Sequence, residues 1–133
     1  MVAEAIKKKI YLASISPRRK SILKELLEPA NVSFESVGPA FKEIENNYPP
    51  QKLVAVNAAG KVKSLQSKID NESLIIGADT VVCVGNDIVG KPDNENTARQ
   101  YLKKLSGKSH SVFTGVAVFD SLSQMFYEGY EES

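Results

Sequence analysis

Residues 74–84, LIIGADTVVCV, determine more about the fold than any other stretch of this sequence. The stretch is rich in β-branched residues and almost wholly apolar, which is typical of a central strand buried on both faces of a sheet. Asp79 and Thr80 interrupt it. A buried carboxylate is costly unless it is paired, bound to a metal or used in catalysis, so Asp79 is a candidate catalytic residue. The alternative is a structural aspartate held by backbone donors.

Strand-like and helix-like stretches alternate on both sides of this segment. Short apolar or alternating runs predict further strands at residues 9–14, 31–37 and 110–119, with shorter hairpin partners at 88–89 and from 124 to 127. Proline signals and helical spacing predict helices from residue 17 to the proline at 29, at 51–69, and from 93 or 94 to 107. The fold class expected is therefore α/β, with a mixed sheet of the α+β kind.

Length and composition limit the possible functions. The 133 residues suffice for one domain with a real core, and we expect a single domain over residues 1–133. Seventeen basic residues against sixteen acidic ones give no broad charge for nucleic acid or a membrane surface. No apolar run is long enough to cross a bilayer. One cysteine and one histidine allow neither an intrachain disulfide nor a zinc cluster. We expect a soluble, cytoplasmic protein.

A phosphate site is indicated where the first strand meets the first helix. Ser16 followed by Pro17 predicts a helix N-cap and first turn, and such a terminus presents free N–H groups and the positive end of the helix dipole. The Ser14 hydroxyl and the guanidinium groups of Arg18 and Arg19 add further donors for an anion. The alternative is an ordinary cap followed by solvated arginines.

Residues 85–92, GNDIVGKP, match the spacing of a phosphate-binding P-loop but end in the wrong residue. Pro92 has neither the hydroxyl that binds magnesium nor an N–H group, so the P-loop hypothesis fails. Lys91 still offers a point charge for a phosphate. Lys61, within the second predicted helix, is by itself more typical of a surface lysine.

Two acidic residues in the polar loop before the second helix are candidate metal ligands. Glu43 or Glu45 could complete a site with Asp79, because magnesium is typically held by one or two carboxylates, water and substrate oxygens. The alternative is that both are solvated surface charges.

Four stretches together, residues 10–19, 76–82, 90–92 and 105–116, resemble the Maf family of nucleotide pyrophosphatases in order and spacing. The resemblance implies a Maf/inosine-triphosphatase-like fold, an elongated twisted mixed sheet with flanking helices around a cleft. It also implies hydrolysis of a nucleoside triphosphate to the monophosphate and pyrophosphate with a divalent metal, Mg²⁺ or Mn²⁺.

The resemblance also implies roles for individual residues. Asp79 takes the family's position of proton acceptor and metal ligand, and Glu43 that of the acidic metal ligand, with Glu45 close enough to leave the register open. The implied substrate-binding residues are Ser14, Arg18, Arg19, Lys61, Thr80 and Lys91. The Ser-Pro-Arg-Arg and Asp-Thr forms are similar to the branch that acts on dTTP and UTP, with Arg18 and Thr80 linked to specificity.

The family pattern continues beyond the end of this sequence at Ser133. In the family an Asp-Lys-Ala-Gly-x-Tyr-Gly-Ile-Gln motif follows, which supplies another acidic residue and a glutamine near the base. The resemblance therefore implies a Maf-like domain without this C-terminal part. We expect such a chain to catalyse weakly and either to form a homodimer or larger assembly or to be poorly stable and prone to aggregation. The alternative is a non-catalytic protein that binds nucleotides or has a regulatory role. Such a role resembles the inhibition of septum formation that is associated with Maf proteins.

Overall fold

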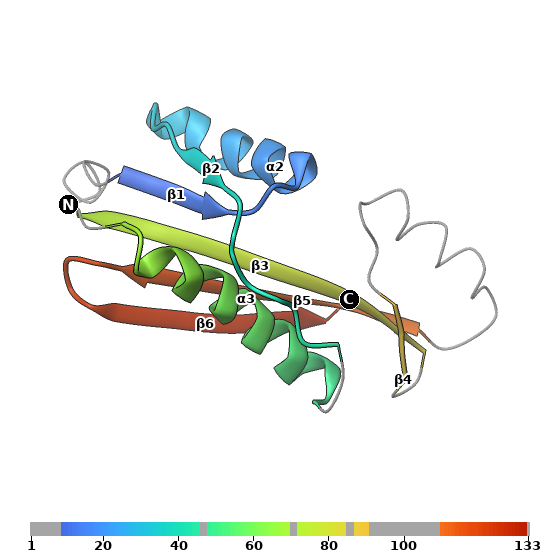
Figure 1. The fold of residues 1–133 in the computed structure, drawn as a ribbon. Helices are drawn as coiled ribbons and strands as arrows, with labels where there is room; N and C mark the ends of the chain where they lie inside the picture. Colours follow the sequence, from blue (N-terminus) through green and yellow to red (C-terminus); the bar gives the residue numbers. More distant parts are fainter. Residues whose placement is uncertain (1–8, 46–47, 70–71, 85–86, 91–109, 133) are drawn as a thin grey trace.

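The computed structural model describes residues 9–45, 48–69, 72–84, 87–90 and 110–132. Strands and helices alternate in the first half of the chain, and antiparallel strands follow (Figure 1). In chain order the elements are β1 (Lys9–Ala13), α2 (Pro17–Leu27), the 3₁₀ helix η1 (Glu28–Ala30), β2 (Glu35–Val37), α3 (Pro50–Gln66), β3 (Ser73–Val84), β4 (Asp87–Gly90), β5 (His110–Asp120) and β6 (Met125–Glu132). The predicted mixed α/β class is confirmed.

The strands form one six-stranded sheet in the order β2-β1-β3-β5-β6, with β4 paired to β3. β1 is parallel to β2 and β3, whereas β4, β5 and β6 pair antiparallel with their neighbours. Because β5 pairs with β3 from Leu74 to Val84, β1 and β4 must share the opposite edge of β3. Pairing with β1 ends at Ile76 and pairing with β4 begins at Val82. Within the described chain, no strand pairs with residues 77–81 at that edge.

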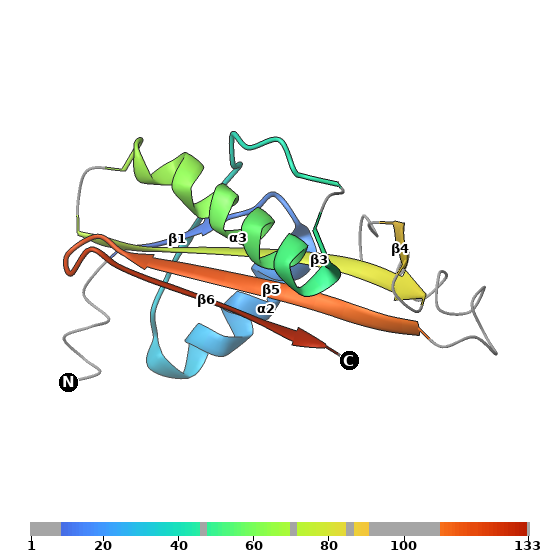
Figure 2. The ribbon, with the colours of Figure 1, turned by 90° about the horizontal axis from the view of Figure 1, so that it is seen from below.

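The two long helices lie on opposite faces of the sheet (Figure 2). The connection from β1 to β2 runs through α2 toward one edge, and the connection from β2 to β3 runs through α3 back across β1. Crossovers between parallel strands are right-handed. When two successive crossovers run in opposite directions along the sheet, their helices therefore lie on opposite faces. The reversal occurs between β1 and β3. In open α/β sheets, ligands bind beyond the carboxyl ends of the strands at such a switch point.

Helix α3 packs closely against β3 and β5 because glycines face it. A Cβ atom at Gly115 would lie 2.4 Å from the carbonyl carbon and oxygen of Val54, and one at Gly77 would lie 2.8 Å from the carbonyl oxygen of Ala58. The absence of side chains there lets the backbones of helix and strand meet. Two groups of buried apolar residues complete this interface: Ala13, Ala58, Ala59, Val62, Leu65, Ile75, Ala117 and Phe119, and Leu53, Val54, Val81, Cys83 and Phe113.

The other face of the sheet is less covered than the sequence predicts. Residues of β3 alternate between buried and half-buried from Ser73 to Thr80, so this part of the strand is fully buried only on its α3 side. Helix α2 has no buried side chain, and Ile22 and Leu26 are 42% and 70% exposed. The prediction of a strand buried on both faces is therefore wrong, because α2 covers little of the second face.

Several predicted boundaries shift or lie outside the described residues. The strand predicted at residues 31–37 is confined to Glu35–Val37, and the helix predicted at 51–69 runs from Pro50 to Gln66. The predicted hairpin partner of β3 is confirmed as β4. The helix predicted from residue 93 or 94 to 107, and Lys91, lie outside the described residues. No helix among those described is long and apolar enough to cross a membrane.

Candidate active site

The buried carboxylate of Asp79 is the centre of a polar cluster between β3 and α3. Asp79 lies on the α3 side of β3 and is almost fully buried. Its Oδ1 lies 3.4 Å from the Lys61 ammonium, and its Oδ2 accepts a hydrogen bond of 3.1 Å from the Asn57 amide. A buried carboxylate is stable only with such partners. The predicted burial of Asp79 is confirmed, and the partners include an ammonium and an amide.

Lys61 is buried, contrary to what a helical lysine alone suggests. Its Nζ lies 2.7 Å from Glu43 Oε1 and donates a 3.0 Å hydrogen bond to the carbonyl oxygen of Ala78, besides its contact with Asp79. The interpretation of Lys61 as a surface residue is wrong, because α3 turns this position toward β3. The ammonium therefore joins Glu43 and Asp79, two of the residues singled out from the sequence.

Asn57 is a site residue that the sequence reasoning missed. It is fully buried on α3, one turn before Lys61, and its amide contacts both Asp79 and the backbone of Ile44. A signal was present in the sequence. The i, i+4 stripe of α3 that includes Leu53 and Leu65 carries Asn57 and Lys61 at its centre, and polar residues inside an apolar stripe are costly unless they are paired.

The predicted helix start is confirmed, and Ser14 lies beside it. The Oγ of Ser16 accepts a 3.4 Å hydrogen bond from the N–H of Arg19, with Pro17 at the first helical position. Ser14 is buried at the end of β1, and its hydroxyl oxygen accepts the N–H of Ser16 at 3.0 Å. Arg18 is exposed in the first turn of α2.

Arg19 and Thr80 meet on the face of the sheet opposite Asp79. Arg19 Nη2 donates a 3.5 Å hydrogen bond to Thr80 Oγ1, which lies 3.3 Å from Thr114 Oγ1 on β5. Successive side chains of a strand point to opposite faces, so Asp79 and Thr80 are separated by the sheet although they are adjacent in sequence. Of the two arginines, Arg19 rather than Arg18 makes this contact.

Both halves of the site include a residue from the stretch of β3 that pairs with neither β1 nor β4 in the described chain. Asp79 and Thr80 both lie within residues 77–81, between the ends of β1 and β4 along the edge of β3 that these two strands share. Ser14 follows β1 at the same place, where the order of the strands reverses. The structure thus brings Glu43, Lys61 and Asp79 together on one face and Arg19 and Thr80 on the other, with Ser14 at the edge between them.

The two acidic residues fit a magnesium ion whose other ligands are waters or phosphate oxygens. Within the ranges that the structure describes, no three His, Cys, Asp or Glu side chains converge as a ready metal cage. Glu43 and Asp79 nevertheless flank one ammonium, and the Glu43 side chain is 35% exposed to solvent. Two carboxylates suit Mg²⁺, which usually keeps several waters and binds one or two carboxylates plus phosphate oxygens.

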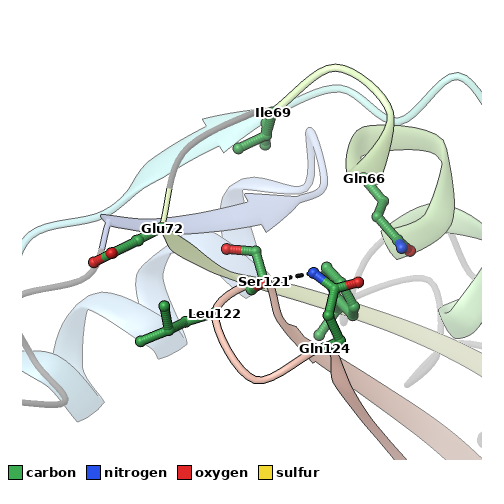
Figure 3. Close-up of a pocket in the computed structure, with 7 residues that line it drawn as sticks. Gln66, Ile69, Glu72, Ser121, Leu122 and Gln124 are labelled. Atoms are coloured by element: carbon green, nitrogen blue, oxygen red, sulfur yellow. Dashed lines mark hydrogen bonds between the residues drawn. The ribbon is translucent and has the colours of Figure 1, made fainter.

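A separate hollow of about 330 Å³ lies at the far end of the sheet (Figure 3). The end of α3, the beginning of β3 and the β5–β6 turn surround it, and Gln124 donates a 2.6 Å hydrogen bond to the carbonyl oxygen of Ser121 there. None of the site residues predicted from the sequence lines it. The polar cluster around Asp79 therefore remains the candidate active site.

A mixed sheet with helices on both faces, a switch point and a buried carboxylate–lysine cluster defines an α/β protein with a candidate active site beside the switch point. The family profile described as Maf-like protein matches residues 9–132, so the chain belongs to the Maf family. Among curated proteins it is similar to dTTP/UTP pyrophosphatases. The identity is 44% over 118 residues with that of Dictyoglomus thermophilum, and 42% over 115 residues with that of Alkaliphilus metalliredigens.

These relatives are longer than the chain. The matched residues cover 87% and 86% of the chain but 58% of each of these two relatives. A Bacillus cereus dTTP/UTP pyrophosphatase, 40% identical, shares 91% of the chain and 62% of its own length. The chain thus spans about three fifths of the length of the curated relatives it matches.

Solved structures support the fold. A nucleoside-triphosphatase / dITP/XTP pyrophosphatase from Mycobacterium abscessus matches with a TM-score of 0.54 at 17% identity, covering 93% of this chain and 71% of that one. The Ham1 protein of Staphylococcus aureus matches with a TM-score of 0.53 at 14% identity, covering 94% and 70%. At these identities the likeness concerns the fold alone.

Proposed function

We propose that this protein hydrolyses a nucleoside triphosphate to the monophosphate and pyrophosphate, with dTTP and UTP as substrates. The observation that supports this most is the buried Asp79 carboxylate, joined through Lys61 to Glu43 beside the switch point. The similarity to dTTP/UTP pyrophosphatases supports the choice of substrates. Ser14, Arg18, Arg19, Lys61, Thr80 and Lys91 are proposed to bind the nucleotide.

Different residues of the described chain meet the different requirements of phosphoanhydride hydrolysis. Hydrolysis needs neutralised phosphate charge, a positioned water and a group that accepts its proton. Arg18 and Arg19, at the positive end of the α2 dipole, neutralise the phosphates. Asp79 accepts the proton of the attacking water. Asp79 and Thr80 lie in the stretch of β3 that pairs with neither β1 nor β4 in the described chain, so a triphosphate bound there would lie near residues of both faces.

Glu43 and Asp79 are proposed to hold a divalent cation, Mg²⁺ or Mn²⁺, together with phosphate oxygens. When bound, such an ion polarises the phosphate and offsets its charge. The carboxylates of Glu43 and Asp79 and the ammonium of Lys61 carry a net charge of about −1. This charge favours the binding of a cation over that of an anion. Lys61 keeps the two carboxylates close together in the absence of the ion by screening their mutual repulsion.

The products formed from dTTP and UTP test this function. We expect the purified protein with Mg²⁺ or Mn²⁺ to release pyrophosphate and the monophosphate, resolved by anion-exchange chromatography. Asp79→Asn should lower kcat by about 10²-fold or more, because it removes the proton acceptor and a charged ligand while keeping the side-chain shape. Asp120→Asn, an aspartate that caps the turn after β5, is the matched control and should leave kcat unchanged.

Three results would count against parts of the proposal. Orthophosphate as the first product would exclude a pyrophosphatase. Normal turnover in Asp79→Asn would assign Asp79 a structural role. Tight nucleotide binding without any product would instead favour the non-catalytic, regulatory alternative.

A further inference from the structure

The Asn57 amide makes three hydrogen bonds to two separate parts of the site. Its Oδ1 accepts the N–H of Ile44 at 2.8 Å, and its Nδ2 donates to the carbonyl oxygen of Ile44 at 2.8 Å. Nδ2 also donates to Asp79 Oδ2 at 3.1 Å. The side chain therefore joins the backbone of the loop before α3 to the carboxylate on β3.

No other side chain of similar size can make this set of contacts. The pattern requires one acceptor and two donors on a planar group, which an amide supplies. The orientation follows from the network, because a flipped amide would place its oxygen against the Ile44 carbonyl and the Asp79 carboxylate. Aspartate would lose both donors and leucine all three bonds, leaving buried polar groups without partners.

Asn57 and Lys61 attach the same two parts of the site to one another. Lys61 follows Asn57 by one helical turn, so both side chains lie on the β3-facing side of α3. Lys61 contacts the Glu43 side chain and Asp79 Oδ1, while Asn57 contacts the adjacent Ile44 backbone and Asp79 Oδ2. Lys61 can move its flexible chain to follow a carboxylate. The Asn57 contacts fix the backbone that carries Glu43.

We propose that Asn57 is a positioning residue, which holds the Glu43 loop and the Asp79 carboxylate in the relative placement that lets both bind one divalent cation. This inference rests on the metal site of the proposed function. Asn57 itself binds no metal; it acts through the Ile44 backbone and Asp79 Oδ2. Hydrogen-bond partners of metal-binding carboxylates commonly change metal affinity about 10–100-fold when they are removed.

Mn²⁺ binding without nucleotide tests the inference and needs no turnover. Free Mn²⁺ is titrated by electron paramagnetic resonance against the wild-type protein, Asn57→Leu and Asn57→Ala. We expect the Kd for Mn²⁺ to rise about tenfold or more in both variants. Amide hydrogen exchange should show faster exchange at Ile44, while the amides at the centre of β3 keep their protection.

Leu65→Ala is the matched control. Leu65 is buried on the same helix and packs in the apolar core, with no contact to Glu43, Ile44 or Asp79 among the interactions of the described chain. It lowers stability through a cavity, so it separates loss of stability from loss of positioning. We expect its Mn²⁺ affinity to stay within about twofold of the wild type. The alanine variant of Asn57 keeps the test valid if the leucine variant fails to fold.

The outcomes separate this inference from the function on which it rests. A wild-type protein that binds no Mn²⁺ would refute the metal site itself, and the role of Asn57 with it. Wild-type binding that is equally tight in the folded Asn57 variants would refute only the positioning role. An equal loss of affinity in Leu65→Ala would show that stability, rather than placement, controls binding.

Discussion

At the scale of single residues, the site depends on polar groups whose burial is compensated by one another. Asp79, Lys61 and Asn57 are all buried and all hydrogen-bonded. Removing one member of such a cluster takes a hydrogen bond from a buried partner, which costs more than that hydrogen bond contributes. The buried side chains are therefore restricted to one arrangement. Arg18 is not part of this buried cluster, because it lies in the exposed first turn of α2.

Cys83 gives a prediction about pH. Burial raises the pKa of its thiol above the ordinary value of about 9, and the negative charge of Glu132 raises it further. The folded state then binds the proton more tightly than the unfolded state, so the associated stability is complete below pH 9 and is lost as the pH rises through the raised pKa. We expect the free energy of unfolding to decline above pH 9, and less so in Cys83→Ala.

The same residue should react slowly with thiol reagents. The thiolate is the reactive form, and both the raised pKa and the burial of Cys83 reduce access to it. Reaction with a disulfide reagent at pH 8, followed by absorbance, should be much slower in the folded protein than in urea. Equal rates would show that Cys83 is accessible.

At the scale of elements, close contact between α3 and the sheet places the polar cluster. Glycines on β3 and β5 let the α3 backbone approach, and this approach brings Lys61 and Asn57 within reach of Asp79. Helix α2 lacks such contacts and buries no side chain. The two helices thus differ: α3 is held by its core, whereas α2 contributes mainly its N-terminus and Arg19.

Gly115 should be the most sensitive glycine in this interface. In Gly115→Ala the new Cβ would meet the Val54 backbone at 2.4 Å, so α3 must shift, at a cost of about 1–3 kcal/mol in the free energy of unfolding. Gly129→Ala on β6 is the matched control, since nothing lies within 4 Å of its new Cβ. Urea unfolding of both variants measures the difference. A loss of similar size in both would show that the contact with Val54 is not the cause.

At the scale of the whole molecule, one face of the described structure exposes more apolar surface than the other. Besides Ile22 and Leu26 on α2, Val116 of β5 and Met125 and Tyr127 of β6 are exposed on this face, and Ile15 is 84% exposed. In the described sheet β6 pairs only with β5, so it forms an edge strand. Apolar patches and unpaired edges favour association with other protein surfaces. The predicted homodimer or larger assembly is consistent with this surface.

Substitution of Leu26 tests the predicted association. We expect the wild-type chain to form dimers or larger species in light scattering coupled to size exclusion, and Leu26→Gln to shift the distribution toward the monomer. Because Leu26 is 70% exposed, the change should alter stability by no more than about 0.5 kcal/mol. Lys24→Gln, an exposed position on the same helix, is the matched control. A wild-type chain that stays monomeric at high concentration would contradict the prediction.

The local elements follow from the sequence. Strand β3 is recognisable from its β-branched run, the start of α2 from Ser16 and Pro17, and the hairpin to β4 from the turn between them. These signals act over a few residues, through backbone sterics, side-chain period and capping, so they need no knowledge of the rest of the chain. The buried carboxylate at Asp79 was also predictable, because a lone acidic residue in the middle of an apolar strand is buried together with its neighbours.

Only the tertiary structure decided which residues share a site. Asp79 and Thr80 are neighbours in sequence yet face opposite sides of the sheet, and each meets a different helix: Lys61 and Asn57 of α3, or Arg19 of α2. Which side chains of α3 turn inward depends on how the helix packs against Gly77 and Gly115, a contact between segments far apart in the chain. Local pattern determines the period of a helix, but the partner surface determines which face becomes the buried one.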